Sequence, residues 1–148
     1  MTVFADRVLA AVNKKQSALV VGIDPALERL PASLLNEARR GGGGTYAAAG
    51  RALSRFGIEL LHAAAPYAVA IKPQLAYFER YGSYGLQALE EIVAAARAAG
   101  LLVIADGKRN DIGSTAEAYA AAYLGDDSPL AVDALTVNAY LGSDGVEP

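Results

Sequence analysis

The segment 106–111 (DGKRND) places the carboxylate of Asp106 two residues before the ammonium group of Lys108, with a second carboxylate at Asp111. The apolar run before it predicts a buried strand that delivers these side chains. Because side chains alternate along a strand, Asp106 and Lys108 should point the same way. A lysine held beside a carboxylate keeps its positive charge and is positioned to act as a general acid. An ion-pair network that only secures the end of the strand fits the same spacing equally well.

Polar residues also end the other apolar runs of the chain, namely Asp24, Lys72 and Asn138. In both common parallel α/β architectures, the carboxyl ends of the strands form the face that carries the functional site. We therefore expect these side chains to share one edge of a sheet, where Lys72 and Asp111 would extend the charge pair into an alternating array. The alternative for any one of them is a turn residue or a surface charge.

The elements that position these side chains alternate along the chain. Short apolar runs predict four strands, at residues 18–23, 67–72, 101–105 and 131–138. Helical periodicity separates the strands, whereas residues 26–44, which end in four glycines, are expected to form a loop. Strands separated by helices indicate a parallel sheet with right-handed crossovers. An open doubly wound sheet and part of an eight-stranded barrel both fit, and periodicity alone does not separate them.

Three polar residues are expected to begin helices. Thr2 and Ser83 are predicted N-caps of the first and third helices. Ser114, followed three residues later by Glu117, has the form of a capping box for the helix before the last strand.

The amino-acid composition indicates what kind of protein this is and excludes some kinds of partner and site. The chain has 148 residues, of which 53% are hydrophobic and 20% charged, so we expect one packed domain over residues 1–148. A net charge of −3 provides no basic surface, and neither nucleic acid nor membrane is an expected partner. The absence of cysteine excludes disulfides and thiolate metal sites. With no signal peptide and no apolar run near the ~20 residues that span a bilayer, we expect a soluble, cytoplasmic protein.

Taken together, the motifs resemble those of the orotidine 5′-phosphate decarboxylase family, in its longer bacterial form. The pattern Asp-x-Lys-x-x-Asp-Ile occupies residues 106–112. The other matching segments are VGIDP at 21–25, IKPQ at 71–74, YFE at 77–79, DIGST at 111–115, TVN at 136–138 and YLG at 140–142. The resemblance covers the whole chain in the correct order. It implies an α/β fold of the (β/α)8 TIM-barrel type, which typically takes about 250 residues. About the first four βα units would be present here, as an N-terminal half-barrel with open edges.

The resemblance also implies an activity and the residues that perform it. The reaction would be decarboxylation of orotidine 5′-phosphate to uridine 5′-phosphate in pyrimidine nucleotide biosynthesis, without a metal or an organic cofactor. Lys108 would donate the proton to carbon 6, and Asp106 would lie against the substrate carboxylate. Lys72 would bridge Asp106 and the ribose, and Asp24 would accept a hydrogen bond from a ribose hydroxyl. Asp111 would complete the catalytic array.

The resemblance also implies how the chain assembles, and it shows where this sequence differs from the family pattern. Asp111, Ile112 and Thr115 match positions that family members contribute across a dimer interface, so a homodimer is implied. Pairing through the open barrel edges is the other expected assembly. Gly107 and Asn110 stand where the pattern has alanine and glycine, and Asn110 would shift Asp111 if that turn needs a positive φ.

In the family, the side chains that bind the substrate phosphate belong to the second half of the barrel. We therefore expect the 148-residue chain alone to be weakly active or inactive.

Two alternatives to a working decarboxylase remain. One alternative is a metal-dependent sugar-phosphate aldolase or decarboxylase of the same superfamily. The other is a non-catalytic half-barrel that acts as an assembly module.

Overall fold

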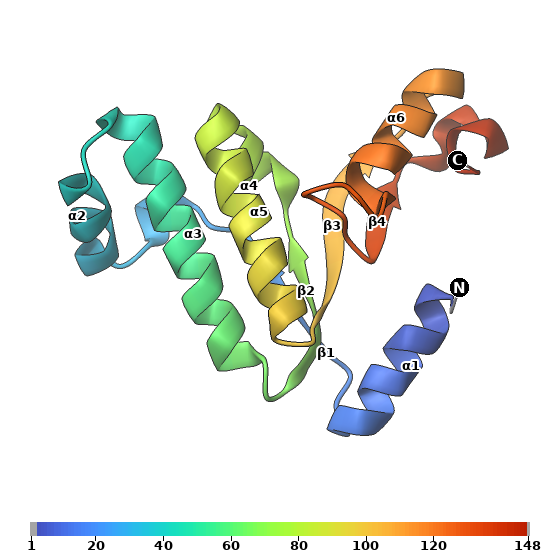
Figure 1. Ribbon diagram of the computed structural model, residues 1–148, viewed down its shortest axis with the longest axis horizontal. Coiled ribbons are helices and arrows are strands. Elements are labelled where there is room, and N and C mark those ends of the chain that lie inside the picture. The colour runs from blue at the N-terminus through green and yellow to red at the C-terminus, as the bar shows by residue number, and fades with distance from the viewer. Residues whose placement is uncertain (1–2, 148) are drawn as a thin grey trace.

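The computed structural model describes residues 3–147, and strands alternate with helices along the chain (Figure 1). In chain order the helices and strands are α1 (Phe4–Lys15), β1 (Leu19–Ile23), α2 (Ala32–Arg40), α3 (Gly44–Ala64), β2 (Ala68–Pro73), α4 (Leu75–Glu79), α5 (Gly82–Ala98), β3 (Leu102–Arg109), α6 (Gly113–Leu124) and β4 (Ala134–Val137). Short 3₁₀ turns lie at Leu27–Arg29, Ala139–Leu141 and Ser143–Gly145.

The order of the strands decides between the two architectures that the sequence left open. The sheet runs β1-β2-β3-β4, and each neighbouring pair is parallel. A doubly wound sheet reverses its strand order beside an early strand, which creates its ligand crevice. A barrel instead adds each new strand beside the previous one. The uninterrupted order over four strands is therefore that of a barrel segment, as the resemblance implied.

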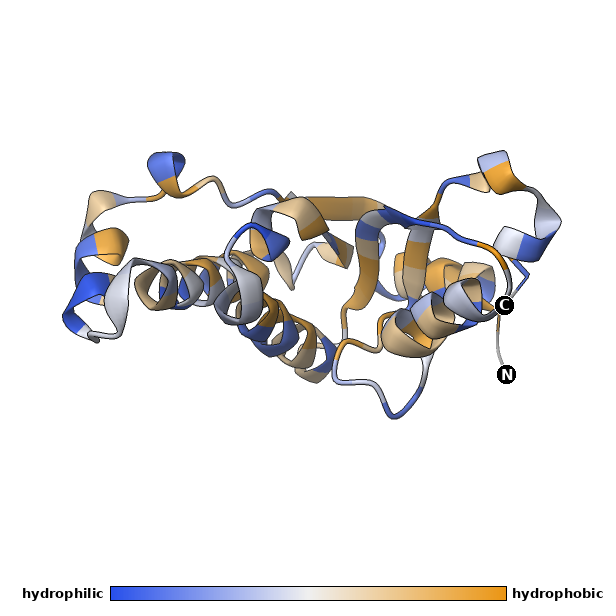
Figure 2. Cartoon of the chain, turned by 90° about the horizontal axis from the view of Figure 1, so that it is seen from above, coloured by the Kyte–Doolittle hydropathy of each residue, from blue (hydrophilic) through white to orange (hydrophobic). Residues whose placement is uncertain are grey.

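Helices cover one face of this sheet, and the core lies between the two layers (Figure 2). On β3 the alternation is clear, because Val103 and Ala105 are buried in the core whereas Leu102 and Ile104 are only partly buried. The core adds large apolar side chains from the other elements, including Ile23, Leu53, Leu61, Ile71, Phe78, Leu89, Ile92 and Val93. Strand β3 therefore has one fully packed face and one less protected face, as expected for a strand that lines the inside of a barrel, whereas residues 68–71 of β2 are buried on both faces.

Helices α3 and α5 pack directly against each other, and glycines of α3 face the contact. A Cβ added to Gly57 would lie 2.3 Å from Cδ1 of Ile92, and one added to Gly50 would lie 2.6 Å from the carbonyl oxygen of Tyr84. A side chain at position 50 would push the helices apart because it would meet backbone, whereas one at position 57 would require the Ile92 side chain to move. The close contact makes α3 and α5 a tightly packed support for the strands behind them.

Several local expectations from the sequence need correction. Residues 32–40, expected within a loop, form helix α2, whose Leu34 packs with Leu30 and Ala52 in a separate small cluster. The first residues of α5 and α6 are Gly82 and Gly113, and neither helix has a side-chain cap.

The predicted caps at Ser83 and Ser114 are wrong for a common reason. Each serine follows a glycine with positive φ, Gly82 or Gly113, that turns the chain into the helix. Each serine therefore already lies in the first turn. The predicted cap Thr2 lies outside the described residues.

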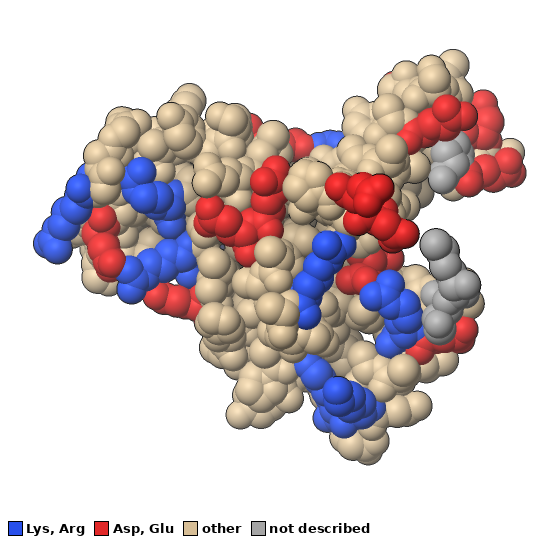
Figure 3. All heavy atoms as spheres, viewed as in Figure 1, with Lys and Arg blue, Asp and Glu red and all other residues tan. Residues whose placement is uncertain are grey.

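None of the helices between residues 3 and 147 has the length and apolar composition needed to cross a bilayer. On the face of the molecule shown in Figure 3, basic and acidic side chains lie in small groups among uncharged ones.

Candidate functional site

A buried carboxylate, that of Asp106, lies at the carboxyl end of β3 between two lysines. Asp106 is 8% exposed. Nζ of Lys72, from the end of β2, donates to Oδ2 of Asp106 at 2.6 Å. Nζ of Lys108 donates to the other oxygen, Oδ1. The structure thus brings together three of the residues that the sequence singled out.

The surroundings of Asp106 stabilise its charged form. Hydrogen bonds from Lys108 and then Lys72 hold the pKa of the Asp106 carboxyl well below its usual range, and a hydrogen bond from Thr136 acts in the same direction. Burial opposes them, because it favours the neutral acid. The carboxylate is therefore ionised at neutral pH and binds two ammonium groups. The side chain of Lys108 nevertheless remains 61% exposed, so its ammonium group is accessible to a small molecule.

Lys72 reaches this array from a regular strand. It pairs in parallel register with Gly22 of β1, and Pro73 pairs with Ile23 in the next position. One residue further, Gln74 forms a bridge to Asp106, and its side-chain Nε2 donates to Oδ2 at 3.2 Å. Ordinary sheet pairing is sufficient to hold this side of the array.

Lys108 reaches the array from an irregular part of β3. Ala105 pairs with Leu135 and Arg109 with Val137, so β3 advances by four residues while β4 advances by two. Such a bulge bends a strand and redirects its side chains, and bulges are frequent beside functional sites. Within it, Lys108 adopts a left-handed backbone conformation with φ of 49°. The closeness of Asp106 and Lys108 therefore depends on a bulge as well as on the strand alternation from which the sequence predicted it.

Arg109 attaches the bulge to two helices. Its guanidinium forms an ion pair with Glu79 of α4 and donates to the carbonyl oxygen of Gly107 at 2.9 Å. The same group lies 5.9 Å from the ring centres of Tyr119 and Tyr123 of α6. Arg109 thus links the backbone of the bulge to α4 and α6.

The remaining predicted residues lie outside this array. Asp24 is exposed at the end of β1. Asp111 accepts a hydrogen bond from the backbone N–H of Ile112 at 2.8 Å, and within residues 3–147 it forms no ion pair with the two lysines. Ile112 is 57% exposed, and Thr115 is exposed at the start of α6. Within one chain the array therefore has the order Lys-Asp-Lys, without the fourth member expected from the sequence.

The condition under which Asn110 would shift Asp111, a turn that needs a positive φ at residue 110, is not met. Among residues 3–147, the non-glycine residues with positive φ are Gln16 and Lys108, so the left-handed residue of this segment is the lysine. The side-chain amide of Asn110 is buried and has no hydrogen-bond partner within the described structure. A Cβ on Gly145 would lie 2.3 Å from its Oδ1, so the asparagine packs directly beneath the last 3₁₀ turn.

Two residues of the site were not singled out from the sequence. Thr136 belongs to the matched segment TVN, but nothing in its type indicated that its hydroxyl contacts Asp106, at 3.0 Å. Arg109 belongs to the charged segment 106–111, yet nothing in that segment indicated its partners, which are Glu79 of α4 and two tyrosines of α6. Both residues lie in segments that the sequence motifs had identified, but their residue types did not indicate what they would contact.

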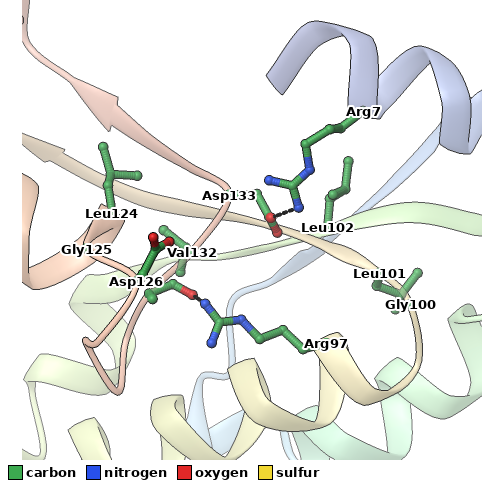
Figure 4. Close-up of a pocket in the computed structure, with 11 residues that line it drawn as sticks. Arg7, Arg97, Gly100, Leu101, Leu102, Leu124, Gly125, Asp126, Val132 and Asp133 are labelled. Atoms are coloured by element: carbon green, nitrogen blue, oxygen red, sulfur yellow. Dashed lines mark hydrogen bonds and ion pairs between the residues drawn. The ribbon is translucent and has the colours of Figure 1, made fainter. Parts of the chain in front are cut away.

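A cavity of about 760 Å³ lies at the opposite end of β3 (Figure 4). The basic groups that line it are already paired, Arg7 with Asp133 and Arg97 with the carbonyl oxygen of Ala131. In barrels, groups at the amino ends of the strands usually serve stability, and functional groups lie at the carboxyl ends. The array at Asp106, and not this cavity, is therefore the candidate active site.

Comparisons with known proteins agree on one family. The model of the "Orotidine 5'-phosphate decarboxylase / HUMPS family" matches residues 17–148. The orotidine 5′-phosphate decarboxylase of Rhodopirellula baltica is 46% identical over 152 residues, which cover 100% of this chain and 49% of that protein. The corresponding enzyme of a Nocardioides species is 46% identical over 148 residues, covering 100% of this chain and 50% of that protein.

Solved structures give the same result. A structure from Streptomyces avermitilis aligns with a TM-score of 0.80 and 44% identity, over 100% of this chain and 48% of that chain. Leishmania donovani OMP decarboxylase aligns with a TM-score of 0.74 and 33% identity, over 99% of this chain and 48% of that chain. The chain thus spans about half the length of the relatives it matches, consistent with an N-terminal half of the longer form.

Proposed function

The chain belongs to the orotidine 5′-phosphate decarboxylase / HUMPS family, and from this membership we propose that it provides the proton-donating half of an orotidine 5′-phosphate decarboxylase site. The observation that carries the proposal is the Lys72–Asp106–Lys108 array at the carboxyl ends of β2 and β3. One buried, ionised carboxylate holds two ammonium groups there. The product would be uridine 5′-phosphate, in pyrimidine nucleotide biosynthesis.

In this proposal Lys108 is the proton donor. The bond between carbon 6 of the pyrimidine and its carboxylate breaks, carbon dioxide leaves, and the electron pair stays on carbon 6. The ammonium group of Lys108 then gives a proton to that carbon and recovers one from solvent. Its pairing with Asp106 and its exposed side chain support this role, because a general acid must be charged, positioned and accessible.

Asp106 and Lys72 would act on the bound substrate. The carboxylate of Asp106 would lie against the carboxylate that is lost, and like-charge crowding would disfavour the ground state relative to the transition state. The same array would stabilise charge on the ring through fixed electrostatics. Lys72 would reach from Asp106 to the ribose, and the exposed carboxylate of Asp24 would accept from a ribose hydroxyl.

A second copy of the chain would complete the site from the other side. We propose that Asp111, Ile112 and Thr115 enter the partner's site across a dimer interface. The exposure of Ile112 and Thr115 supports this arrangement, as does the lack of an ion pair between Asp111 and the two lysines of its own chain within the described residues. The relatives are about twice as long, so we also propose that residues corresponding to their second half bind the substrate phosphate.

The test is turnover of orotidine 5′-phosphate in the presence of a chelator, by the chain alone and by the chain mixed with the second half of the Nocardioides relative. We expect little or no activity from the chain alone and clear activity from the mixture. In the active sample, Lys108→Ala should reduce kcat by about 100- to 10,000-fold, the contribution expected of a general acid. Lys14→Ala, the same substitution at an exposed lysine of α1, serves as the control.

Other results would contradict the proposal in distinguishable ways. No turnover of orotidine 5′-phosphate, together with activity on a sugar phosphate that a chelator abolishes and a divalent metal restores, would favour a metal-dependent sugar-phosphate enzyme of the family. Two halves that are folded and associated but inactive would favour a non-catalytic assembly module.

A further inference from the structure

We infer that Thr136 is a positioning residue that sets the backbone conformation of Lys108 and the orientation of Asp106. The inference rests on the proposed function, because it assigns Thr136 a role in presenting the proton donor. The Thr136 hydroxyl contacts three successive residues of β3.

The hydrogen bonds of this hydroxyl use its full capacity. Oγ1 of Thr136 accepts from the backbone N–H of Gly107 at 3.1 Å and from that of Lys108 at 3.0 Å. It donates its proton to Oδ1 of Asp106 at 3.0 Å. A hydroxyl has one proton and two lone pairs, so all of its bonding positions are occupied. The direction of each bond is also determined, because N–H groups only donate and an ionised carboxylate only accepts.

The two backbone bonds explain how the bulge is held. Successive N–H groups of an extended strand point to opposite sides, so both reach one oxygen only where the strand is distorted. The distortion here is the left-handed conformation of Lys108. A residue with a side chain rarely adopts that conformation, and it persists only where its surroundings enforce it. Thr136, opposite the bulge on β4, is one such enforcing contact.

The third bond fixes the carboxylate that both lysines share. Thr136 and Lys108 donate to the same oxygen, Oδ1, whereas Lys72 and Gln74 donate to Oδ2. Rotation of the Asp106 side chain would therefore break bonds on both sides. One hydroxyl thus determines where the backbone of Lys108 lies and where its ammonium group is bound.

The first experiment measures the chain alone, without any substrate. Hydrogen exchange of the Gly107 and Lys108 amides and the carboxyl titration of Asp106 are followed by NMR in the wild type, Thr136→Val and Thr136→Ser. Valine keeps the shape of threonine but lacks the hydroxyl, and serine keeps the hydroxyl but lacks the methyl group. We expect valine to speed exchange of both amides by at least about 10-fold and to move the titration of Asp106 to higher pH.

The comparison of the two variants separates positioning from packing. Serine should retain slow exchange and the low titration of Asp106, because it keeps the three hydrogen bonds. A threonine that merely filled space would give the opposite order, with valine like the wild type and serine impaired, and that result would overturn the inference. If the Thr136→Val variant does not fold, the Thr136→Ser variant tests the inference by itself. Fast exchange of both amides in a folded Thr136→Ser variant would also overturn the positioning role of Thr136. Thr45→Val, at an exposed threonine of α3, is the matched control.

The second experiment measures turnover in the mixture of halves described above. Thr136→Val should lower kcat by about 10- to 100-fold with KM changed only a few-fold, the effect expected from a small displacement of a reacting group. Serine should restore kcat to within a few-fold of the wild type. A valine variant with unchanged kcat would overturn the role in presenting Lys108. An inactive wild-type mixture would contradict the proposed function instead, and the exchange and titration data would still decide whether Thr136 holds the bulge.

Discussion

The core between α3, α5 and β2 contrasts with the carboxyl ends of β3 and β4. In the core, Leu53, Ile71 and Ile92 are fully buried among other apolar side chains. At the strand ends, a buried carboxylate holds two lysines, and one of these lysines, Lys108, has a left-handed backbone. The first region is regular and apolar, whereas the second is charged and distorted.

The difference indicates which forces organise each region. Burial of apolar surface is non-directional, so many residues share the stabilisation of the core and no single partner is indispensable. The strand ends depend on a few directed bonds, of which the Thr136 hydroxyl makes three. Changes in the core should therefore have the larger effects on stability, whereas changes at the strand ends should have smaller effects on stability and should alter the chemistry of the site. The following predictions test that separation, beginning with the largest expected effect.

Truncation of Phe78 should have the largest effect on folding. Its side chain is 0% exposed and lies in the core beside the sheet. Phe78→Ala should lower the free energy of unfolding by about 3–5 kcal/mol, measured by urea denaturation. Tyr140→Ala, at a side chain that is 92% exposed, is the control and should have little effect. Equal effects of the two variants would show that the core does not dominate stability.

Neutralisation of Asp106 should have a smaller effect that depends on pH. Its pKa in the folded state lies below the unfolded value of about 3.9, so the ionised carboxylate stabilises the fold above that pH, and this contribution is lost as the pH falls through the folded pKa. Asp106→Asn should cost about 1.5 kcal/mol near neutral pH, at the low end for hydrogen bonds to a charged group because both lysines reach solvent.

The measurement for Asp106 is denaturation of wild type and variant at a series of pH values. The difference between them should shrink as the pH falls below about 4, where the wild type begins to bind the proton that the variant lacks. A difference that stays constant with pH would show that the charge of Asp106 contributes nothing to the fold.

The smallest effect is expected at an exposed ion pair of the helical layer. Arg55 donates to Glu59 one turn along α3 at 2.8 Å, and the two side chains are 50% and 59% exposed. Exposed ion pairs contribute little to the stability of the fold because solvent and salt screen the charges. Glu59→Gln should leave the thermal unfolding midpoint unchanged within the error of the measurement. A clear loss would show that polar contacts on the helices also support the core.

Local patterns were sufficient to predict most of the elements. The strands expected at 18–23 and 67–72 correspond to β1 and β2, within a residue or two at each end. The strand expected at 101–105 continues in the structure to Arg109, through the charged segment. The helix α2 was missed because its short apolar stripe is completed only by contacts with Leu30 and Ala52.

The candidate site was predictable in part. Its charged members follow apolar runs directly, and the alternation of side chains along a strand was sufficient to place Asp106 and Lys108 on the same side. The partners that orient them could not be identified in the same way. Thr136 is 30 residues from Asp106, and no local pattern distinguishes its hydroxyl from that of an ordinary strand threonine.

The amino-acid sequence by itself determined the alternation of strands and helices, the polar carboxyl ends of the strands and the charged segment at 106–111. These features depend on periodicity and residue type over a few neighbouring positions, which side-chain alternation and backbone propensity translate directly into structure. Only the tertiary structure decided the strand order, the bulge opposite Thr136, the left-handed Lys108 and the position of Asp111 away from the two lysines of its own chain. Each of these depends on how segments far apart in sequence pair and share hydrogen bonds, and such pairing is specified by the whole sheet.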